Sequence, residues 1–295
     1  MNYFTVGNNE LIDALFQYCN NIGTNPSDVL NLAKKFGRLD YWSVDDDKEL
    51  FLKTNFYDIT LYRNGKISNM RSLEDIERVA RPETPFEFLS KASYIMENKD
   101  MVRERVLKGQ FFQPFGISTD GVFNSRCRAA VRLTKNILRY LKRYGIDAEL
   151  LIMPADSYAM EVNGYSKDIV DRFICDMEGF CSGGSNPRTN IVRWSKIRED
   201  NRGRYEELSR GFSVPIDILQ RLQERAQRFS LLSPVASAAR YASERYAEAR
   251  IINEVLEPIK ISAADTDVDV LDGTLPRIYP FKMSKFPWKS SKWGD

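Results

Sequence analysis

The amino-acid sequence predicts an α/β protein whose core is a Rossmann-like parallel sheet flanked by helices. Two observations lead to this prediction. From about residue 108 onward, short apolar runs alternate with longer helical patterns, which is typical of βαβ units. Ahead of that point the pattern is different. We therefore expect an N-terminal α+β elaboration over residues 1–105 and a Rossmann-like catalytic domain over 106–295.

In the N-terminal part, the spacing of the apolar residues predicts short helices near 9–20 and 27–36. Alternating segments around an Asn-Gly pair at 64–65 predict a β-hairpin, because Asn-Gly suits a type I′ turn. A helix near 84–97 follows. No catalytic constellation is visible here, so we expect a packing or covering module.

The C-terminal part predicts strands and helices in alternation. The expected strands are 110–118, 147–156, 189–197 and one within 275–283, and the expected helices are 124–144, 166–180, 200–230 and 234–257. Gly145 is a natural stop for the first of these helices. In such sheets the site lies beyond the carboxyl ends of the strands, which would gather Ser118, Asp156 and the 195–198 segment.

Composition excludes several kinds of site. The 295 residues include no histidine, so Ser-His-Asp hydrolases, Cys-His proteases and HExxH metalloproteases are excluded. Neither GxGxxG nor GxxxxGK[ST] occurs, so dinucleotide and P-loop nucleotide sites have no support. The four cysteines form no CxxC pair and read as idle reduced thiols. We therefore expect neither a metal nor a cofactor.

Hydropathy and charge indicate a soluble protein. No stretch approaches the roughly 20 apolar residues of a membrane span, and the N-terminus lacks the layout of a signal peptide. We therefore expect a cytoplasmic protein without a membrane partner. The net charge is only +2, so an anionic partner would have to be held by a local patch.

One helix, 124–144, carries such a patch. Its basic residues recur every three or four positions and share one face: Arg128, Arg132, Lys135, Arg139, Lys142 and Arg143. The stripe is either a track for nucleic-acid phosphates or a solvated helix face. No acidic residue interrupts it between 125 and 146, which favours a polyanionic partner.

The helix SERYAEARIINEVLEP offers carboxylates. Arg250 and Glu254 lie one turn apart, as do Asn253 and Glu257, and surface ion pairs of this kind are usually structural. Glu254 is nevertheless flanked by aliphatic residues. A carboxylate that faces a partly apolar pocket could hold an ammonium group.

Tyr279 lies between two prolines in the segment PRIYPFKM, residues 276–283. Where no imidazole is available, a phenol can donate or relay a proton. The alternative interpretation is a core tyrosine in an edge strand.

The segment FFQPFGISTDGVFNS, residues 111–125, places Ser118 between a predicted strand and a predicted helix. A serine at such a turn is the usual location of an exposed nucleophile. Such serines normally transfer their proton to a histidine. If Ser118 is a nucleophile, its activation must come from something other than an imidazole.

Taken in chain order, these motifs resemble the tRNA-dependent cyclodipeptide synthases. Gly116-Ile117-Ser118 is similar to the glycine–aliphatic–serine motif at the end of that family's first strand, which puts Ser118 on its nucleophile. Asp156 looks like the acidic residue after the second strand. The glycine-centred turn that follows it is similar to Asn163-Gly164-Tyr165-Ser166.

Three later segments extend the resemblance, which covers about 108–285. Arg193-Trp194-Ser195 is similar to a short aromatic–serine turn of the family. The helix from Arg250 to Glu254 resembles a family helix that has tyrosine four residues before glutamate. Tyr279-Pro280 matches the Tyr-Pro of one of the two main subfamilies.

Two positions depart from the family pattern. Arg250 stands where the helix tyrosine is expected, unless the register is shifted and Glu257 is the matching glutamate. Gly121 stands where one subfamily has asparagine, which favours the other subfamily. The N-terminal part has no counterpart and suggests an outlying branch, for which the fungal arginine-using enzymes are a comparison.

The resemblance implies a fold like the catalytic domain of class I aminoacyl-tRNA synthetases, without ATP or a cofactor. It implies that Ser118 takes the aminoacyl group from one aminoacyl-tRNA. A second aminoacyl-tRNA then supplies an amine, and the dipeptide cyclises to a diketopiperazine, in the manner of secondary-metabolite biosynthesis. Glu254 would hold the substrate ammonium and Tyr279 would assist proton transfer, while the basic helix would bind tRNA. The implied substrate-binding residues are Gly116, Asp156, Asn163, Arg250, Glu257 and Pro280.

Three other functions stay open at the level of sequence. The first is a transferase that moves an aminoacyl group from tRNA to another acceptor. The second is a tRNA- or RNA-binding protein without catalysis. The third is a serine hydrolase of another kind, in which a lysine replaces histidine.

Overall fold

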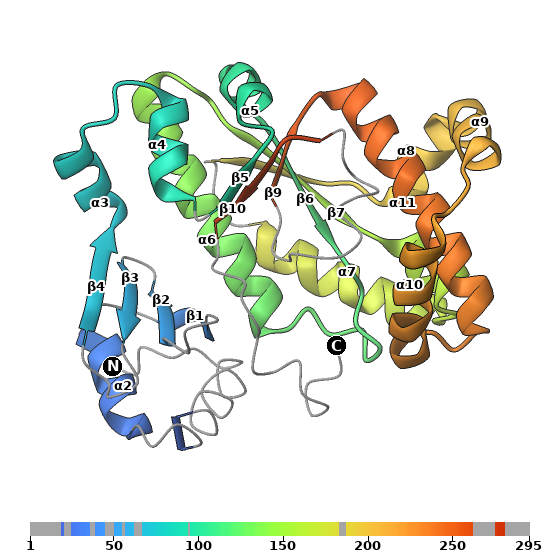
Figure 1. Ribbon diagram of the computed structural model, residues 1–295, viewed down its shortest axis with the longest axis horizontal. Coiled ribbons are helices and arrows are strands. Elements are labelled where there is room, and N and C mark those ends of the chain that lie inside the picture. Colours follow the sequence, from blue (N-terminus) through green and yellow to red (C-terminus); the bar gives the residue numbers. More distant parts are fainter. Residues whose placement is uncertain are drawn as a thin grey trace. The chain divides into compact units, whose positions relative to one another are not determined.

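The computed structural model describes residues 19–20, 25–35, 39–44, 50–54, 57–61, 67–93, 95–182, 187–261 and 275–280 (Figure 1). Among these residues no helix is both long and apolar enough to cross a membrane. The helix expected near 9–20 falls almost entirely outside the described residues, as does the turn at 64–65.

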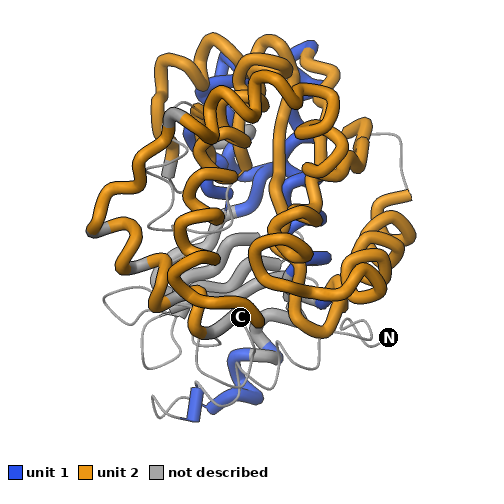
Figure 2. The backbone as a smooth tube through the Cα atoms, turned by 90° about the vertical axis from the view of Figure 1, so that its right-hand side faces the viewer, with its two compact units in different colours: residues 1–95, 124–145, 279–294 blue, residues 96–123, 146–278, 295 orange. Residues whose placement is uncertain are grey.

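The chain divides into two compact units (Figure 2). Unit 1 comprises 1–95, 124–145 and 279–294. Unit 2 comprises 96–123, 146–278 and 295. The division into domains at residue 105 stays a prediction about how the chain folds.

Unit 1 contains a four-stranded sheet in the order β1-β2-β3-β4, with all three neighbouring pairs antiparallel. The strands are β1 (Leu39–Val44), β2 (Leu50–Thr54), β3 (Tyr57–Leu61) and β4 (Ile67–Ser72). Residue 59 pairs with residue 70 across β3 and β4, which confirms the predicted hairpin. The strand β1 was not predicted.

The helical elements of unit 1 are α2 (Pro26–Lys35), α3 (Leu73–Asp75), the π-helix η1 (Ile76–Ala80), α4 (Pro85–Ala92), α6 (Ser125–Leu141) and the 3₁₀ turn η3 (Lys142–Tyr144). The predicted helix at 84–97 is therefore shorter, and residues 95–97 form a strand instead. Helix α6 begins where the side chain of Asn124 accepts a hydrogen bond from Cys127 N at 3.1 Å. It gives way through η3 to Gly145, whose φ is +78°.

Unit 2 is built on the predicted parallel sheet. The six strands stand in the order β5-β10-β9-β6-β7-β8, and every pair from β10 to β8 is parallel. They are β5 (Ile95–Glu97), β6 (Gln110–Phe115), β7 (Glu149–Pro154), β8 (Arg188–Ile191), β9 (Ile259–Ile261) and β10 (Arg277–Tyr279). The central strands β6 and β7 are mostly apolar, as expected where helices cover both faces of a parallel sheet.

The helical elements of unit 2 are α5 (Lys99–Arg105), η2 (Val106–Lys108), η4 (Tyr158–Val162), α7 (Lys167–Cys181), α8 (Trp194–Asp200), α9 (Arg202–Gly211), α10 (Ile216–Phe229) and α11 (Pro234–Leu256). Helix α11 covers one face of the sheet, where Ile252 shares a core cluster with Phe112 and Met153. Phe115 points to the other face, where Phe123 joins it to Phe173 of α7. The predicted α/β architecture with helices on both faces is thus confirmed.

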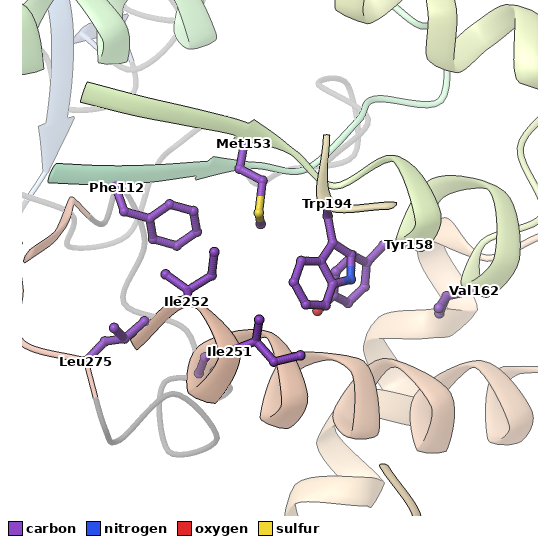
Figure 3. Packing of buried hydrophobic residues seen from close by; sticks show 9 residues of the cluster. Phe112, Met153, Tyr158, Val162, Trp194, Ile251, Ile252 and Leu275 are labelled. Atoms are coloured by element: carbon purple, nitrogen blue, oxygen red, sulfur yellow. The ribbon is translucent and has the colours of Figure 1, made fainter. Parts of the chain in front are cut away.

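The main core of unit 2 lies between the sheet and α11 (Figure 3). Trp194 is its largest fully buried side chain, and Tyr158 lies beside it. Ile251 and Ile252 close the cluster from below in this view. Removing a side chain of this size from such a core costs about 3–5 kcal/mol, so the cluster fixes α8 and α11 against the sheet.

Two predicted elements of unit 2 differ in extent. The strand expected over 189–197 ends at Ile191, and α8 begins at Trp194. The single helical stretch expected over 200–230 is two helices, because residues 212–215, which include Pro215, interrupt it.

Candidate active site at the carboxyl edge of the sheet

Ser118 lies in a tight loop that follows β6. Its hydroxyl donates to Val122 O at 3.0 Å and accepts from Val122 N at 3.2 Å. Gly121 N donates to Ser118 O at 3.1 Å, which closes the turn. The half-buried hydroxyl is thus held at the carboxyl end of a central strand, the place where parallel sheets carry their sites.

The Ser118 loop is seated on helix α7. Gly121 has φ +67°, and a Cβ at this position would lie 2.5 Å from the carbonyl oxygen of Ile169. Arg172, one turn further along α7, donates to Asp120 O at 3.4 Å. The loop can approach this closely only because residue 121 has no side chain.

Gly116, two residues before Ser118, is exposed, and a Cβ there would have no atom of the described residues within 4 Å. The main chain leading to Ser118 is therefore open to solvent on this side.

Ser118 has no side-chain base within hydrogen-bonding distance among the described residues, because both of its side-chain hydrogen bonds go to Val122. The geometry holds a hydroxyl in place but does not activate it. A reaction at Ser118 therefore requires a substrate that is already reactive.

Asp156 and Ser195 meet at the same edge of the sheet. The buried carboxylate of Asp156 accepts from Ser195 N at 2.9 Å and also from the Ser195 hydroxyl. It therefore caps the N-terminus of α8 from the neighbouring strand β7. The sequence paired these two segments correctly, and in this structure their contact positions α8 and its buried Trp194.

Asn163 ends the π-helix η4, and its carbonyl accepts from Leu231 N at 2.8 Å. Gly164 follows with φ +78°, and Leu232 packs closely against it. The predicted glycine-centred turn is present, and it holds the connection between α10 and α11.

The predicted glutamates of α11 lie at the surface in ion pairs. Glu254 accepts two hydrogen bonds from Arg204 of α9, at 3.0 and 2.7 Å, and these lower the pKa of its carboxyl group. Glu257, just past the helix end, pairs with Lys108, whose hydrogen bond lowers the pKa of that carboxyl. Neither carboxylate faces the apolar pocket expected for Glu254. Arg250 instead stacks over the Tyr246 ring, 3.4 Å from its centroid.

Tyr279 ends the buried strand β10 and is 3% exposed, and the buried Pro280 follows it. The division between the two units falls between Ile278 and Tyr279, so these two residues count with unit 1, although β10 belongs to the sheet of unit 2, the unit that also holds Ser118. Their role beside the serine therefore stays a prediction.

The basic face of α6, also in unit 1, is only partly exposed. Arg139, Lys142 and Arg143 are exposed at its C-terminal end, and Arg143 lies 4.7 Å above the ring of Tyr140. Arg128 and Arg132 are half-buried, and Lys135 is only 8% exposed. The solvent-facing positive surface is thus shorter than the six-residue stripe.

Sequence reasoning missed a buried ionic network on α11. Glu244, 1% exposed, accepts from Trp194 Nε1 at 2.9 Å, from Arg198 Nη1 at 2.8 Å and from Tyr205 OH at 2.5 Å. Three donors satisfy this carboxylate, so it ties α8 and α9 to α11.

Glu161 of η4 extends the network through Arg198 and Arg240. Burial raises the pKa of Glu161, but the hydrogen bonds and positive charges of Arg198 and Arg240 together outweigh this effect, so the pKa is lowered on balance. The same carboxylate thus joins η4 to α8 and to the start of α11.

A second buried ion pair, Arg245–Glu248, lies one turn further along α11. Counted from Glu244, the residues four, seven and eight positions later are Glu248, Ile251 and Ile252. This spacing places all four on one helix face. That spacing in the sequence could have revealed both glutamates as buried.

Among the described residues no group of three or more Asp, Glu, Cys or His side chains could hold a metal ion.

No protein-family model matches the chain, and no curated protein sequence matches it. Solved structures similar to it include tyrosyl-tRNA synthetase from Archaeoglobus fulgidus, with 12% identity and a TM-score of 0.47 over 66% of this chain and 62% of that one. Tryptophanyl-tRNA synthetase from Aeropyrum pernix has 18% identity and a TM-score of 0.42 over 71% of this chain and 60% of that one. The PvcA protein from Pseudomonas aeruginosa has 11% identity and a TM-score of 0.46 over 70% of this chain and 87% of that one.

The chain spans less than two thirds of the length of either synthetase. All three TM-scores are below 0.5.

Proposed function

We propose that this chain is a tRNA-dependent cyclodipeptide synthase that uses two aminoacyl-tRNAs in sequence. The placement of Ser118 carries the proposal. Its hydroxyl is held at the carboxyl end of β6 beside an open main chain, and its side-chain hydrogen bonds go to Val122. Such a hydroxyl suits an acyl donor that arrives activated, and an aminoacyl ester of tRNA is one.

The reaction balances without a histidine. The Ser118 oxygen attacks the carbonyl carbon of the first aminoacyl ester, and the tRNA ribose oxygen leaves and takes up the serine proton. The amine of the second aminoacyl-tRNA then attacks the aminoacyl-serine, which transfers its acyl group and gives a dipeptidyl-tRNA or, after return to Ser118, a dipeptidyl-enzyme. The free amine of the dipeptide then attacks the ester that still joins the dipeptide to tRNA or to Ser118. This closes the diketopiperazine and releases the hydroxyl of the ribose or of the serine.

The proposal assigns the substrate ammonium to a carboxylate of α11 or of the residue just past its end. The resemblance favours Glu254 or Glu257, whose ion pairs with Arg204 and Lys108 would have to open. Glu248 is the buried alternative on the same helix. Parallel Glu→Gln variants at the three positions, compared for turnover and for melting temperature, identify the one that impairs turnover without unfolding the protein.

The proposal assigns tRNA phosphates to the exposed end of the α6 stripe at Arg139, Lys142 and Arg143. Neutralising phosphates releases condensed counterions, so binding should weaken steeply as salt increases. Tyr279 is proposed to assist proton transfer.

A non-catalytic RNA-binding protein is the second candidate. It is favoured by the fact that both side-chain hydrogen bonds of Ser118 resemble those of an ordinary structural turn. A transferase acting on another acceptor would use the same serine and differ in its released product.

The test is mass spectrometry of extracts from cells that express the protein, Ser118→Ala, or the control Ser166→Ala, an exposed serine at the start of α7. We expect a new cyclic dipeptide with the parent and with Ser166→Ala, and none with Ser118→Ala. A product that persists in Ser118→Ala excludes the serine as nucleophile. If a folded parent gives no cyclic dipeptide, the RNA that copurifies decides between the alternatives.

A further inference from the structure

The Tyr158 hydroxyl is a buried polar group without a hydrogen-bond partner in the described structure. The residue is only 4% exposed and belongs to the main core of unit 2. Leaving a buried hydroxyl unsatisfied costs about 1–3 kcal/mol, and native proteins avoid this with few exceptions. Phenylalanine would fill the same space without that cost.

The surroundings of this hydroxyl are polar, although it is deeply buried. Figure 3 shows the Tyr158 oxygen on the side of its ring that faces α11. Burial raises the pKa of Tyr158; the negative charges of Glu248 and Glu244 raise it further, whereas the positive charge of Arg245 lowers it. The Tyr241 ring meets Tyr158 edge to face, with 5.3 Å between the centroids. A hydroxyl without a partner thus lies in a buried region that also holds the Arg245–Glu248 ion pair and the Tyr241 ring.

The main chain at Tyr158 is also unusual. Tyr158 begins the π-helix η4, and Asn163 N donates to Tyr158 O at 2.9 Å, a bond that spans five residues. Short π-helices are rare and frequently occur at functional sites. This one begins four residues after the end of β7, the strand beside β6, and so follows the same edge of the sheet that carries Ser118.

The charges around Tyr158 balance within the described residues. Arg245 neutralises Glu248, and Arg198 pairs with Glu244. A charged ligand group would enter this low-dielectric region without a counter-ion, which is costly. An uncharged group that accepts a hydrogen bond from the phenol would carry no such cost.

We infer that the Tyr158 hydroxyl is a specificity group that hydrogen-bonds an uncharged polar side chain, a hydroxyl or a carboxamide, of one aminoacyl substrate. The inference rests on the proposed function. A site built to hydrogen-bond a substrate hydroxyl can reject the analogue that lacks it by orders of magnitude, because the buried protein group is then left unpaired.

The test is calorimetric titration of the purified chain with amino-acid amides in matched pairs. The pairs are tyrosinamide with phenylalaninamide, threoninamide with valinamide, and glutaminamide with leucinamide. We expect the polar member of at least one pair to bind tenfold or more tightly than its apolar partner. Tyr158→Phe should abolish that preference. Tyr165→Phe, which alters a second buried phenol close by, should retain it.

Equal binding within every pair, or a preference that survives in Tyr158→Phe, overturns the inference. The melting temperature of Tyr158→Phe separates loss of a ligand contact from loss of structure. Removing a hydroxyl without a partner should leave it unchanged or higher. A fall shows a structural hydrogen bond and also overturns the inference.

Failure of the inference and failure of the proposed function are distinguishable. A Ser118-dependent cyclic dipeptide with two apolar side chains would refute the role of Tyr158 and leave the synthase intact. A Tyr158-dependent preference among the amides, with no cyclic dipeptide in extracts, would refute the synthase and retain the binding site.

Discussion

Gly121 links the position of Ser118 to helix α7, and Gly121→Ala tests that link. The substitution places a methyl group 2.5 Å from Ile169 O, closer than real Cβ atoms approach a main-chain oxygen. It also forces a side chain to accept φ +67°, which costs about 1–2 kcal/mol on its own. Relief of the contact requires the loop to lift from α7, and Ser118 would move with it.

We expect Gly121→Ala to lose about 2 kcal/mol of stability or more, which corresponds to a fall in melting temperature of roughly 4–8 °C. A displacement of about 1 Å at a nucleophile costs on the order of a hundredfold in rate. Product formation should therefore fall far more than the amount of folded protein. Thermal unfolding followed by circular dichroism and mass spectrometry of the cyclic dipeptide measure the two effects separately.

Gly179→Ala is the matched control because it lies in the same helix, α7, and a Cβ there would meet no atom of the part of the chain that the structure describes within 4 Å. Helix propensity predicts a gain of about 1 kcal/mol there, with unchanged activity. If Gly121→Ala melts at the parent temperature and keeps full activity, the loop does not depend on this contact and the reasoning is wrong.

Three further predictions concern the ionic network and the basic helix. Trp194→Phe removes one donor from the buried carboxylate of Glu244 and should cost about 2 kcal/mol in thermal or urea unfolding; an unchanged midpoint would show that the bond is not needed. Glu161 has a lowered pKa, so its contribution to stability is present above pH 4.5 and is lost as the pH falls through the folded-state value. Glu161→Gln should therefore flatten the dependence of melting temperature on pH below that point, and an unaltered profile would count against the network. Replacing Arg139 and Arg143 together by glutamate should weaken tRNA binding and reduce its salt slope by about two, measured by filter binding at several salt concentrations; a constant slope would mark this surface as merely solvated.

Most of the parallel sheet could be predicted from sequence because its central strands are short apolar runs between long helices. The strand β9 was missed because it has only three residues, Ile259–Ile261, directly after the end of α11. The strand expected over 189–197 was too long for a different reason. The residue that caps α8 is Asp156, about forty positions earlier, so no local signal marks the start of that helix.

The site was predictable where a turn defines it and not where packing does. The chain reversal around Ser118 follows from local residues. The buried glutamates were missed because a charged residue on a helix is normally expected to face water, although they share one helix face with Ile251 and Ile252. Glu254 was expected beside an apolar pocket because its sequence neighbours are aliphatic, yet it lies off the helix face that Ile251 and Ile252 share. Which residues share a face, rather than which are adjacent, decides exposure.

The three donors that meet at Glu244 have a consequence for how this sequence can change over time. Loss of the carboxylate would leave an indole N–H, a guanidinium and a phenol buried together without an acceptor. A single replacement at 244 is therefore harmful unless Trp194, Arg198 and Tyr205 change as well. Relatives of this protein are expected to keep all four residues or to have replaced them as a group. These four positions should therefore covary in an alignment of those relatives.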